Sequence, residues 1–369
     1  MDSLSHLLAL LAPRCEVNLH CRFGGRWQAG HQQMRSGVVP WHVVLRGEGR
    51  LNVGGQTHHL RAGDVVLLPH GSPHLMESLV EWGQVLPVAH RFNGTVTEMR
   101  VGPAEGALEM LCGEFYFGPH VSWLFSEAST LIHLHTDARE DCPELDALLN
   151  ILVRESLAQR PGGSAIVRSL GDTLLVLLLR MLLGEQQPPG GLLRLMSDER
   201  LMPAVLAVMA TPEQPWTLET MAARAFLSRA TFARHFARVY HLTPQAWLSQ
   251  LRMALAARLL RLERQTNLEV IAERCGFQSL ASFSKRFKMR YGVTPGEWRR
   301  GQRLAFREDD FISSCVVCCL LPDPKVAIVL HEKNNDSQDR QGEEDEITFT
   351  GRRRGNAGGS GAGRLRPKG

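Results

Sequence analysis

The chain has 369 residues, of which 44% are hydrophobic and 22% charged, a composition ordinary for a soluble globular protein. That length is enough for two or three domains that each bury a core. The net charge of +4 is unevenly spread: residues 201–303 carry 16 Lys and Arg against 6 Asp and Glu, a local +10 that leaves −6 elsewhere. A basic domain beside an acidic body indicates a polyanionic partner for that domain alone.

Secretion, membrane insertion and a disulfide framework are not indicated by the sequence. The start Met1-Asp2-Ser3 lacks the basic region of a signal peptide, and the apolar run 174–179 is too short to cross a bilayer. We therefore expect a cytoplasmic protein without membrane contact, whose cysteines are reduced. The eight cysteines show no framework spacing; they are Cys15, Cys21, Cys112, Cys142, Cys275, Cys315, Cys318 and Cys319.

Residues 1–142 are predicted to form a small β-barrel. Short apolar runs alternate with Gly-rich turns from about residue 15 to 110, and Gly54-Gly55 between two alternating runs is typical of a hairpin. The block Gly63-Asp64 … Pro69 … Gly71 … Pro73-His74 turns into a buried strand and ends it sharply. This block resembles the cupin family, and the resemblance implies a cupin-like barrel.

Residues 143–184 are predicted to form a pair of helices, because apolar residues recur there at spacings of three and four and a Pro-Gly-Gly sequence interrupts them. The apolar face of this pair packs either on the chain's own barrel or against a second subunit. Residues 185–196, rich in Gln, Pro and Gly, are predicted to be a linker. A new helix is expected near Ser197-Asp198-Glu199.

Residues 197–303 contain two copies of one pattern. In each copy a short helix and a tight turn precede a serine that can cap a basic second helix. The two serines, Ser228 and Ser279, lie 51 residues apart, and one long helix that starts at Pro244 connects the copies. This arrangement predicts tandem helix-turn-helix units, each of which lays its second helix in a major groove of DNA.

The second helix of each copy carries a pair of Phe residues at i and i+4, which we expect to be buried. The remaining positions are expected to face DNA: Arg229, Ala230, Thr231, Ala233 and Arg234 in the first unit, and Leu280, Ala281, Ser282, Ser284, Lys285 and Lys288 in the second. Arg234 is favoured for contacts to guanine, with Lys285 as its counterpart, because a guanidinium can donate two hydrogen bonds to the guanine edge. Leu280 and Ala281 could contact thymine methyl groups.

Residues 197–303 resemble the DNA-binding domain of the AraC/XylS family of transcription regulators. The match is strongest from Gly276-Phe277 through Ser282-Phe283-Ser284-Lys285-Arg286-Phe287 to Thr294-Pro295-Gly296-Glu297-Trp298. His241 departs from the family, which usually has Gly where the first recognition helix ends. The preceding barrel and helical pair resemble the cupin-bearing branch of this family, so the likeness covers about residues 1–303.

The resemblance implies an α+β multidomain protein: a cupin-like sensor barrel (1–142), a helical pair that can dimerise (143–184), a linker (185–196) and an all-α DNA-binding domain (197–303). It implies a sequence-specific regulator of transcription, with activation and repression both open. We expect promoter DNA, RNA polymerase, a small effector or oxidant and a second copy of the chain as partners. The tail 304–369 is expected to be disordered from its composition.

The alternative is a metal-dependent cupin enzyme fused to a helical domain. Catalytic cupins usually carry a His-x-His pair, but here His42 is followed by Val44 at the second position. His74 is available, and His58 and His59 alternate faces, so only one of those two can point inward. We therefore predict no catalytic residue, no metal ligand and no cofactor.

Cys21 is the candidate sensor residue. Cys15 and Cys21 are six residues apart on one predicted strand and should share a face, with Arg14 and Arg22 beside them. Some relatives in the cupin-bearing branch look like oxidant sensors, and this resemblance implies the role for Cys21. The alternative is a buried apolar cysteine, the commoner state of a free thiol.

Overall fold

The computed structural model describes residues 2–103, 107–117, 124–125, 129–136 and 142–301. The tail predicted for 304–369, with Cys315, Cys318 and Cys319, lies outside the described residues. The N-terminal strands are β1 (Arg14–Phe23), β2 (Gln28–His31), β3 (Val38–Arg46), β4 (Glu48–Val53), β5 (Gln56–Arg61), β6 (Asp64–Leu67), β7 (His74–Glu77), β8 (Ala89–Phe92), β9 (Thr97–Val101), β10 (Leu108–Tyr116) and β11 (Ile132–His135).

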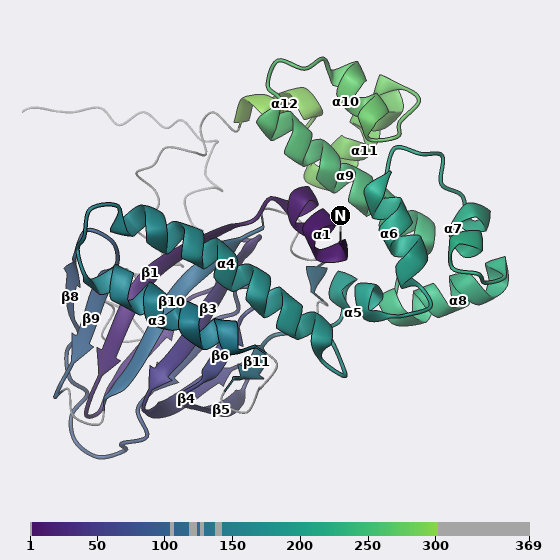
Figure 1. The fold of residues 1–369 in the computed structure, drawn as a ribbon. Coiled ribbons are helices and arrows are strands. Elements are labelled where there is room, and N and C mark those ends of the chain that lie inside the picture. The colour runs from purple at the N-terminus through teal and green to yellow at the C-terminus, as the bar shows by residue number, and fades with distance from the viewer. Residues whose placement is uncertain (1, 104–106, 118–123, 126–128, 137–141, 302–369) are drawn as a thin grey trace, which may run out of the picture. The chain divides into compact units, whose positions relative to one another are not determined.

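The helices divide in sequence into a group that precedes residue 185 and a group that follows it (Figure 1). The first group is α1 (Ser3–Leu11), α3 (Pro143–Leu157) and α4 (Gly163–Gly184). The second group is α5 (Leu192–Ser197), α6 (Met202–Ala210), α7 (Leu218–Arg224), α8 (Arg229–Tyr240), α9 (Pro244–Leu262), α10 (Leu268–Arg274), α11 (Leu280–Tyr291) and α12 (Pro295–Gly301). Within the described residues, none of these helices has the length and apolar character to span a membrane.

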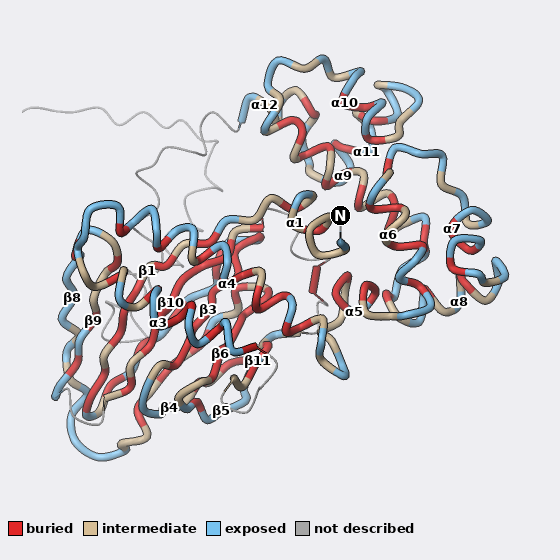
Figure 2. Tube along the Cα trace, viewed as in Figure 1, coloured by how far each residue is buried: buried red, intermediate tan, exposed pale blue. Residues whose placement is uncertain are grey.

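The strands form a seven-stranded sheet, ordered β11-β6-β3-β10-β1-β9-β8, and a four-stranded sheet, ordered β2-β7-β4-β5. Period-two alternation sends neighbouring residues of one strand into different cores. On β3, Val43 belongs to the core that the large sheet shares with α3 and α4, whereas Val44 belongs to the core enclosed by the two sheets. Figure 2 shows long buried stretches along β1, β3 and β10. The expectation of a cupin-like β domain is thus confirmed.

A β-bulge in β1 changes the prediction for its two cysteines. The register of β1 against β10 shifts between Val17 and Leu19, so Asn18 is an extra residue. Cys15 therefore packs in the core under α4, whereas Cys21 packs between the sheets. The prediction that these cysteines share a face was wrong, because the inserted residue reverses the alternation.

The helical pair packs on the chain's own domain. The backbone N–H of Cys15 donates to Asp172 Oδ1 at 3.0 Å, and a Cβ on Gly171 would lie 2.8 Å from the Cys15 sulfur. Only a residue without a side chain allows α4 this close to β1. Among the large apolar residues of α3 and α4, Ile151 and Ile166 remain exposed.

The segment 185–196, predicted to be a linker, is partly helical. Helix α5 begins at Leu192, and its apolar residues Leu192, Leu193 and Leu195 are fully buried. The Pro and Gly composition that indicated a linker extends only to Gly191. Asp198 ends α5, and its carboxylate accepts the backbone N–H groups of Arg200 and Leu201 at the entry to α6.

The C-terminal helices form the two predicted units, α7–α8 and α10–α11, joined by α9. Corresponding positions lie 51 residues apart, and their packing repeats: the Phe232 and Phe236 rings are 5.7 Å apart, and the Phe283 and Phe287 rings 5.8 Å. Each ridge also contacts a tryptophan that follows a Thr-Pro sequence, Trp247 in the first unit and Trp298 in the second.

The two recognition helices end in the same backbone conformation with different residues. His241 has a φ of 61° and Gly292 a φ of 76°, and each donates its N–H to the carbonyl four residues earlier. An L-residue is disfavoured in this left-handed region, whereas glycine adopts it freely.

We expect His241→Gly to raise the free energy of unfolding by about 0.5–1 kcal/mol, because relief of the left-handed penalty outweighs the added freedom of the unfolded chain. Urea unfolding of the full chain measures this. Gly292→Ala is the matched change; it meets no atom within 4 Å, so it should lower stability by about 1 kcal/mol through φ alone. Equal stability of all three proteins would contradict this account of the caps.

Candidate nucleic-acid interface

Each recognition helix begins at a serine cap. The Ser228 side chain accepts the N–H of Thr231 at 3.3 Å, and the Ser279 side chain accepts the N–H of Ser282 at 3.3 Å. A capped N-terminus fixes the first turn, which is the part of a recognition helix that approaches base edges. These contacts confirm the predicted capping serines.

The open face of α8 presents the expected residues of the first unit. Arg229, Ala230 and Arg234 are exposed, and Thr231 and Ala233 are half-buried. The Arg229 guanidinium forms an ion pair with Glu219 of α7 at 3.2 Å. Both side chains are exposed, so a DNA phosphate can replace the carboxylate of Glu219. Within the described residues, Arg234 forms no ion pair, so its guanidinium is available to a ligand.

The open face of α11 presents most of the residues expected in the second unit. Ala281, Ser282, Lys285 and Lys288 are exposed, and Ser284 is half-buried.

Leu280 is placed differently from the expectation, because it packs against the core of the second unit. Its spacing explains this position, since Leu280, Phe283 and Phe287 follow the i, i+3, i+7 stripe of a buried helix face. The structure thus favours a packing role for Leu280 over contact with thymine.

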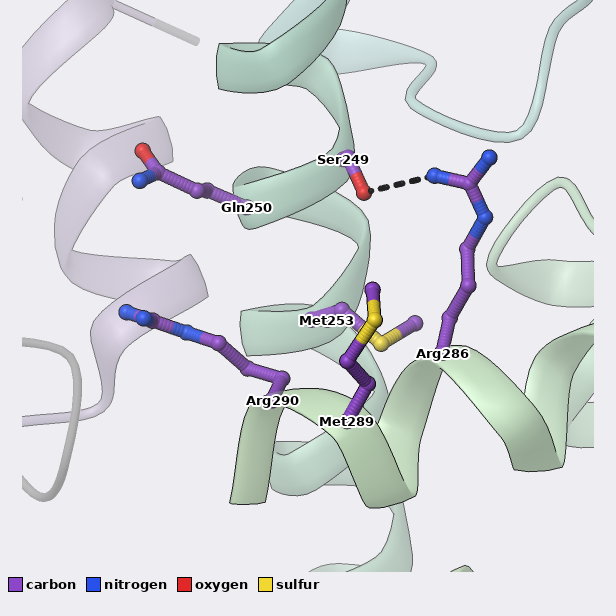
Figure 3. A pocket seen from close by; sticks show the side chains of 6 residues that line it. All are labelled: Ser249, Gln250, Met253, Arg286, Met289 and Arg290. Carbon is purple, nitrogen blue, oxygen red and sulfur yellow. Dashed lines mark hydrogen bonds between the residues drawn. The ribbon is translucent and has the colours of Figure 1, made fainter. Parts of the chain in front are cut away.

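Arg286 points away from the open face of α11. Figure 3 shows it reaching toward α9, where its guanidinium donates to the Ser249 hydroxyl at 3.2 Å. With Met253 and Met289 it lines a shallow pocket between α9 and α11. Lys285 and Arg286 are neighbours in sequence, yet only Lys285 is on the face expected to meet DNA.

Arg252 of α9 ties the connecting helix to both units. Its guanidinium donates to the carbonyls of Pro212 at 2.8 Å and Gln214 at 2.7 Å, just before the first unit. It also lies against Gly276 in the turn of the second unit, where a Cβ would come within 2.7 Å of the guanidinium. Arg252 therefore links the segment that precedes the first unit to the turn of the second unit.

His235 connects the first recognition helix to Asp198, which lies between α5 and α6. Its Nε2 lies 2.8 Å from Asp198 Oδ2, and its Nδ1 lies 2.7 Å from a guanidinium nitrogen of Arg238. Since a guanidinium can only donate, Nδ1 holds a lone pair and Nε2–H donates to the carboxylate. Arg238 is thereby engaged with its own helix.

A separate cluster of three buried histidines lies between the two sheets of the N-terminal domain. His31 of β2, His42 of β3 and His74 of β7 each offer a ring nitrogen, and these atoms lie within 4.8 Å of one another. Burial, with the neighbouring His74 and His31, holds the pKa of His42 well below its usual range, and burial lowers the pKa of His74 to about 3. The sequence alone indicates His42 and His74 but not His31, because only the pairing of β2 with β7 brings His31 beside His74.

Cys21 is fully buried between the sheets and lies opposite Met110 of β10. Arg22, its neighbour on the strand, points to the opposite face, so adjacency in sequence does not bring the guanidinium to the thiol.

Two helix-turn-helix units with exposed basic recognition helices define a DNA-binding protein. Residues 2–184 match a family described as Cupin, and residues 221–301 match one described as Helix-turn-helix domain. An HTH-type transcriptional regulator of Haemophilus influenzae, itself described as uncharacterized, is 31% identical over 304 residues, which are 82% of this chain and 100% of that protein.

Two further relatives match over nearly their whole lengths. The HTH-type transcriptional regulator MtrA of Neisseria gonorrhoeae is 30% identical over 81% of this chain and 98% of its own. The RCS-specific HTH-type transcriptional activator RclR of Escherichia coli is 31% identical over 82% of this chain and 99% of its own. The chain belongs to the AraC/XylS family, in the branch with an N-terminal cupin domain, and is a DNA-binding transcription regulator.

We expect Arg252→Met to lower the free energy of unfolding by about 2–3 kcal/mol, because two backbone carbonyls lose a charged hydrogen-bond donor. Urea unfolding measures the change, and DNA affinity should fall with it. Arg264→Met is the control, since Arg264 is exposed and forms no hydrogen bond among the described residues. A loss no larger than that of the control would contradict the bridging role of Arg252.

Proposed function

We propose that the protein recognises a bipartite DNA site, with α8 and α11 in successive major grooves on one face of the duplex. The observation that carries the proposal is that Arg234 and Lys285, at corresponding positions of the two units, are both exposed on the open face. A guanidinium or ammonium there can contact guanine O6 and N7. The remaining open-face residues, Ala230, Ala233, Ala281 and Ser284 among them, are small enough to let each helix approach the bases.

Within this proposal, the cupin domain (1–142) senses a signal, and the helical pair (143–184) contributes to a homodimer. The signal shifts the population of arrangements in which two DNA-binding domains (197–303) meet their half-sites. Activation through RNA polymerase is the favoured mode, supported by the description of RclR as an activator. A DNA partner supports a cytoplasmic location for the protein.

We infer that the chain is a regulator and not a cupin enzyme. Relatives that match over nearly their full lengths are described as transcription regulators. Val44 points between the sheets at the place where a His-x-His pair would supply its second histidine, so the ligand set of the catalytic cupins is incomplete.

Binding-site selection with the full chain should recover two conserved blocks about one helical turn apart. Arg234→Ala and Lys285→Ala should each relax sequence preference in one block only, with a loss of about 1–3 kcal/mol at that block. The measurement is affinity for the selected site and for sites altered in either block, at two salt concentrations.

Arg264→Ala controls for charge, because it removes one exposed positive charge outside the recognition helices. It should lower affinity for all sequences alike and leave both blocks intact. If Arg234→Ala and Lys285→Ala behaved like Arg264→Ala, α8 and α11 would contribute only electrostatic attachment, and the proposed readout would be abandoned.

We also infer that Cys21 is an oxidant-sensing thiol. The relative RclR is described as RCS-specific, which supports a chemical signal for this branch. Because the Cys21 side chain is fully buried, its oxidation would place a polar group in the apolar core between the sheets and disturb their packing.

Oxidant treatment should change the DNA affinity of the wild-type protein and leave that of Cys21→Ser unchanged. Fluorescence anisotropy with the selected site measures both. Cys15→Ser is the matched control, since Cys15 is equally buried but lies in the other core. An equal response of wild type and Cys21→Ser would end this hypothesis.

A further inference from the structure

The histidine cluster between the sheets is assembled from both sheets. His31 and His74 are register partners on β2 and β7 of the four-stranded sheet, and His42 lies on β3 of the seven-stranded sheet. All three side chains point into the space enclosed by the sheets, and none is more than 8% exposed. Residues from three strands therefore converge at one buried point.

The hydrogen bonds of His74 determine which of its nitrogens holds a lone pair. Its Nδ1 lies 2.9 Å from the Ser72 carbonyl oxygen, which can only accept, so Nδ1 carries the proton. Its Nε2 therefore carries a lone pair and lies 3.1 Å from His42 Nε2. A carbonyl that holds one ring nitrogen while the other is presented as a ligand is the usual support of a metal-bound histidine.

His42 has a donor or acceptor that the protein does not satisfy. Its Nδ1 is buried and has no hydrogen-bond partner, although the side chain is only 1% exposed. Buried polar groups without partners are rare in native structures. Because His42 faces His74 through Nε2, an ion held by the Nε2 atoms would make this Nδ1 the nitrogen that carries the proton. The inference therefore stands on the convergence of ring nitrogens from three strands.

The spacing of the nitrogens fits a transition-metal ion. At metal–nitrogen distances of about 2.0–2.1 Å, tetrahedral geometry places two ligand nitrogens about 3.3 Å apart. The two Nε2 atoms of His42 and His74 are 3.1 Å apart, and the nitrogen of His31 lies within 4.8 Å of both. A small rotation of His31 therefore completes a three-histidine set.

The loop that follows His31 and the loop that precedes His74 are held together by hydrogen bonds. The Met34 N–H donates to the Gly71 carbonyl at 2.9 Å, and the Gln33 amide donates to the His70 carbonyl at 2.7 Å. Gly71, with a φ of 63°, lies so close to Met34 that a Cβ would approach it to 2.5 Å. These contacts set the backbone positions next to His31 and His74 before any ligand arrives.

We propose that His31, His42 and His74 bind one divalent late first-row transition-metal ion, such as Zn²⁺, between the two sheets. Imidazole ligands suit Zn, Cu, Ni and Fe, and three of them leave a fourth position for water or a small ligand. The ligand set differs from that of the catalytic cupins, because β2 supplies the third histidine. The proposal does not rest on the DNA-binding function.

The ion would connect the two sheets, so its binding should stabilise the fold. An ion that binds only the folded chain stabilises it by about 2.7 kcal/mol when free metal exceeds the dissociation constant 100-fold. The first test therefore uses the full chain, stripped with a chelator and titrated with Zn²⁺. We expect one ion per chain by calorimetry and a rise in the unfolding temperature that chelator reverses.

Matched variants distinguish Zn²⁺ binding at this site from binding elsewhere on the chain. His31→Gln and His74→Gln should each weaken Zn²⁺ binding at least about 100-fold and abolish the temperature rise. The control is the double change His133→Gln and His135→Gln, which alters a second histidine group whose members are both already paired with Asp64. The control should bind one ion with unchanged affinity.

X-ray absorption spectra of the wild-type protein with one Zn²⁺ test the site without any substitution, so a variant that fails to fold leaves the proposal testable. Three imidazole nitrogens at about 2.0–2.1 Å are expected. Less than one ion per wild-type chain would overturn the proposal. Fewer than three imidazole ligands would also overturn it. Binding that is lost in the His133/His135 double variant and retained in His31→Gln would do the same. Each of these results would mean an adventitious ion only.

Discussion

The DNA-binding half of the protein depends on one constraint: a single helix, α9, supplies a wall for two separate cores. Trp247, Leu248 and Leu251 in its first part pack with the first unit, while Leu259 and Leu260 in its last part pack with the second. A helix that serves cores on different sides is apolar around most of its circumference. A shift of either unit would therefore disturb its own packing against the helix that also supports the other unit.

In the DNA-binding half, the features that the sequence could predict are those set by neighbouring residues. The serine caps, the Phe pairs at i and i+4 and the end of α8 at His241 all depend on residues within one or two turns, and each is found where it was expected. The partial burial of Leu280 also has a local signal, since Leu280 lies on the same helical stripe as Phe283 and Phe287. Helix α5 lies in the segment predicted to be a linker. The burial of three leucines stabilises a helix there although Pro and Gly precede it.

The N-terminal domain was less predictable because its key relationships are nonlocal. The bulge at Asn18, which separates Cys15 from Cys21, has no marker in the strand sequence and is defined only by the register with β10. In the same way, His31 joins His42 and His74 only because β2 pairs with β7 across a long stretch of chain. Alternation within one strand can be predicted from sequence, whereas the partner opposite a given residue cannot.

The length of α9 has a consequence for the DNA that the protein selects. This helix has 19 residues and is about 28 Å long, and its two ends pack in the cores of the two units. If α8 and α11 read successive grooves as proposed, two units joined by one continuous helix require contacted blocks at a set separation. Adding or removing base pairs between the blocks would then weaken binding without changing a contacted base.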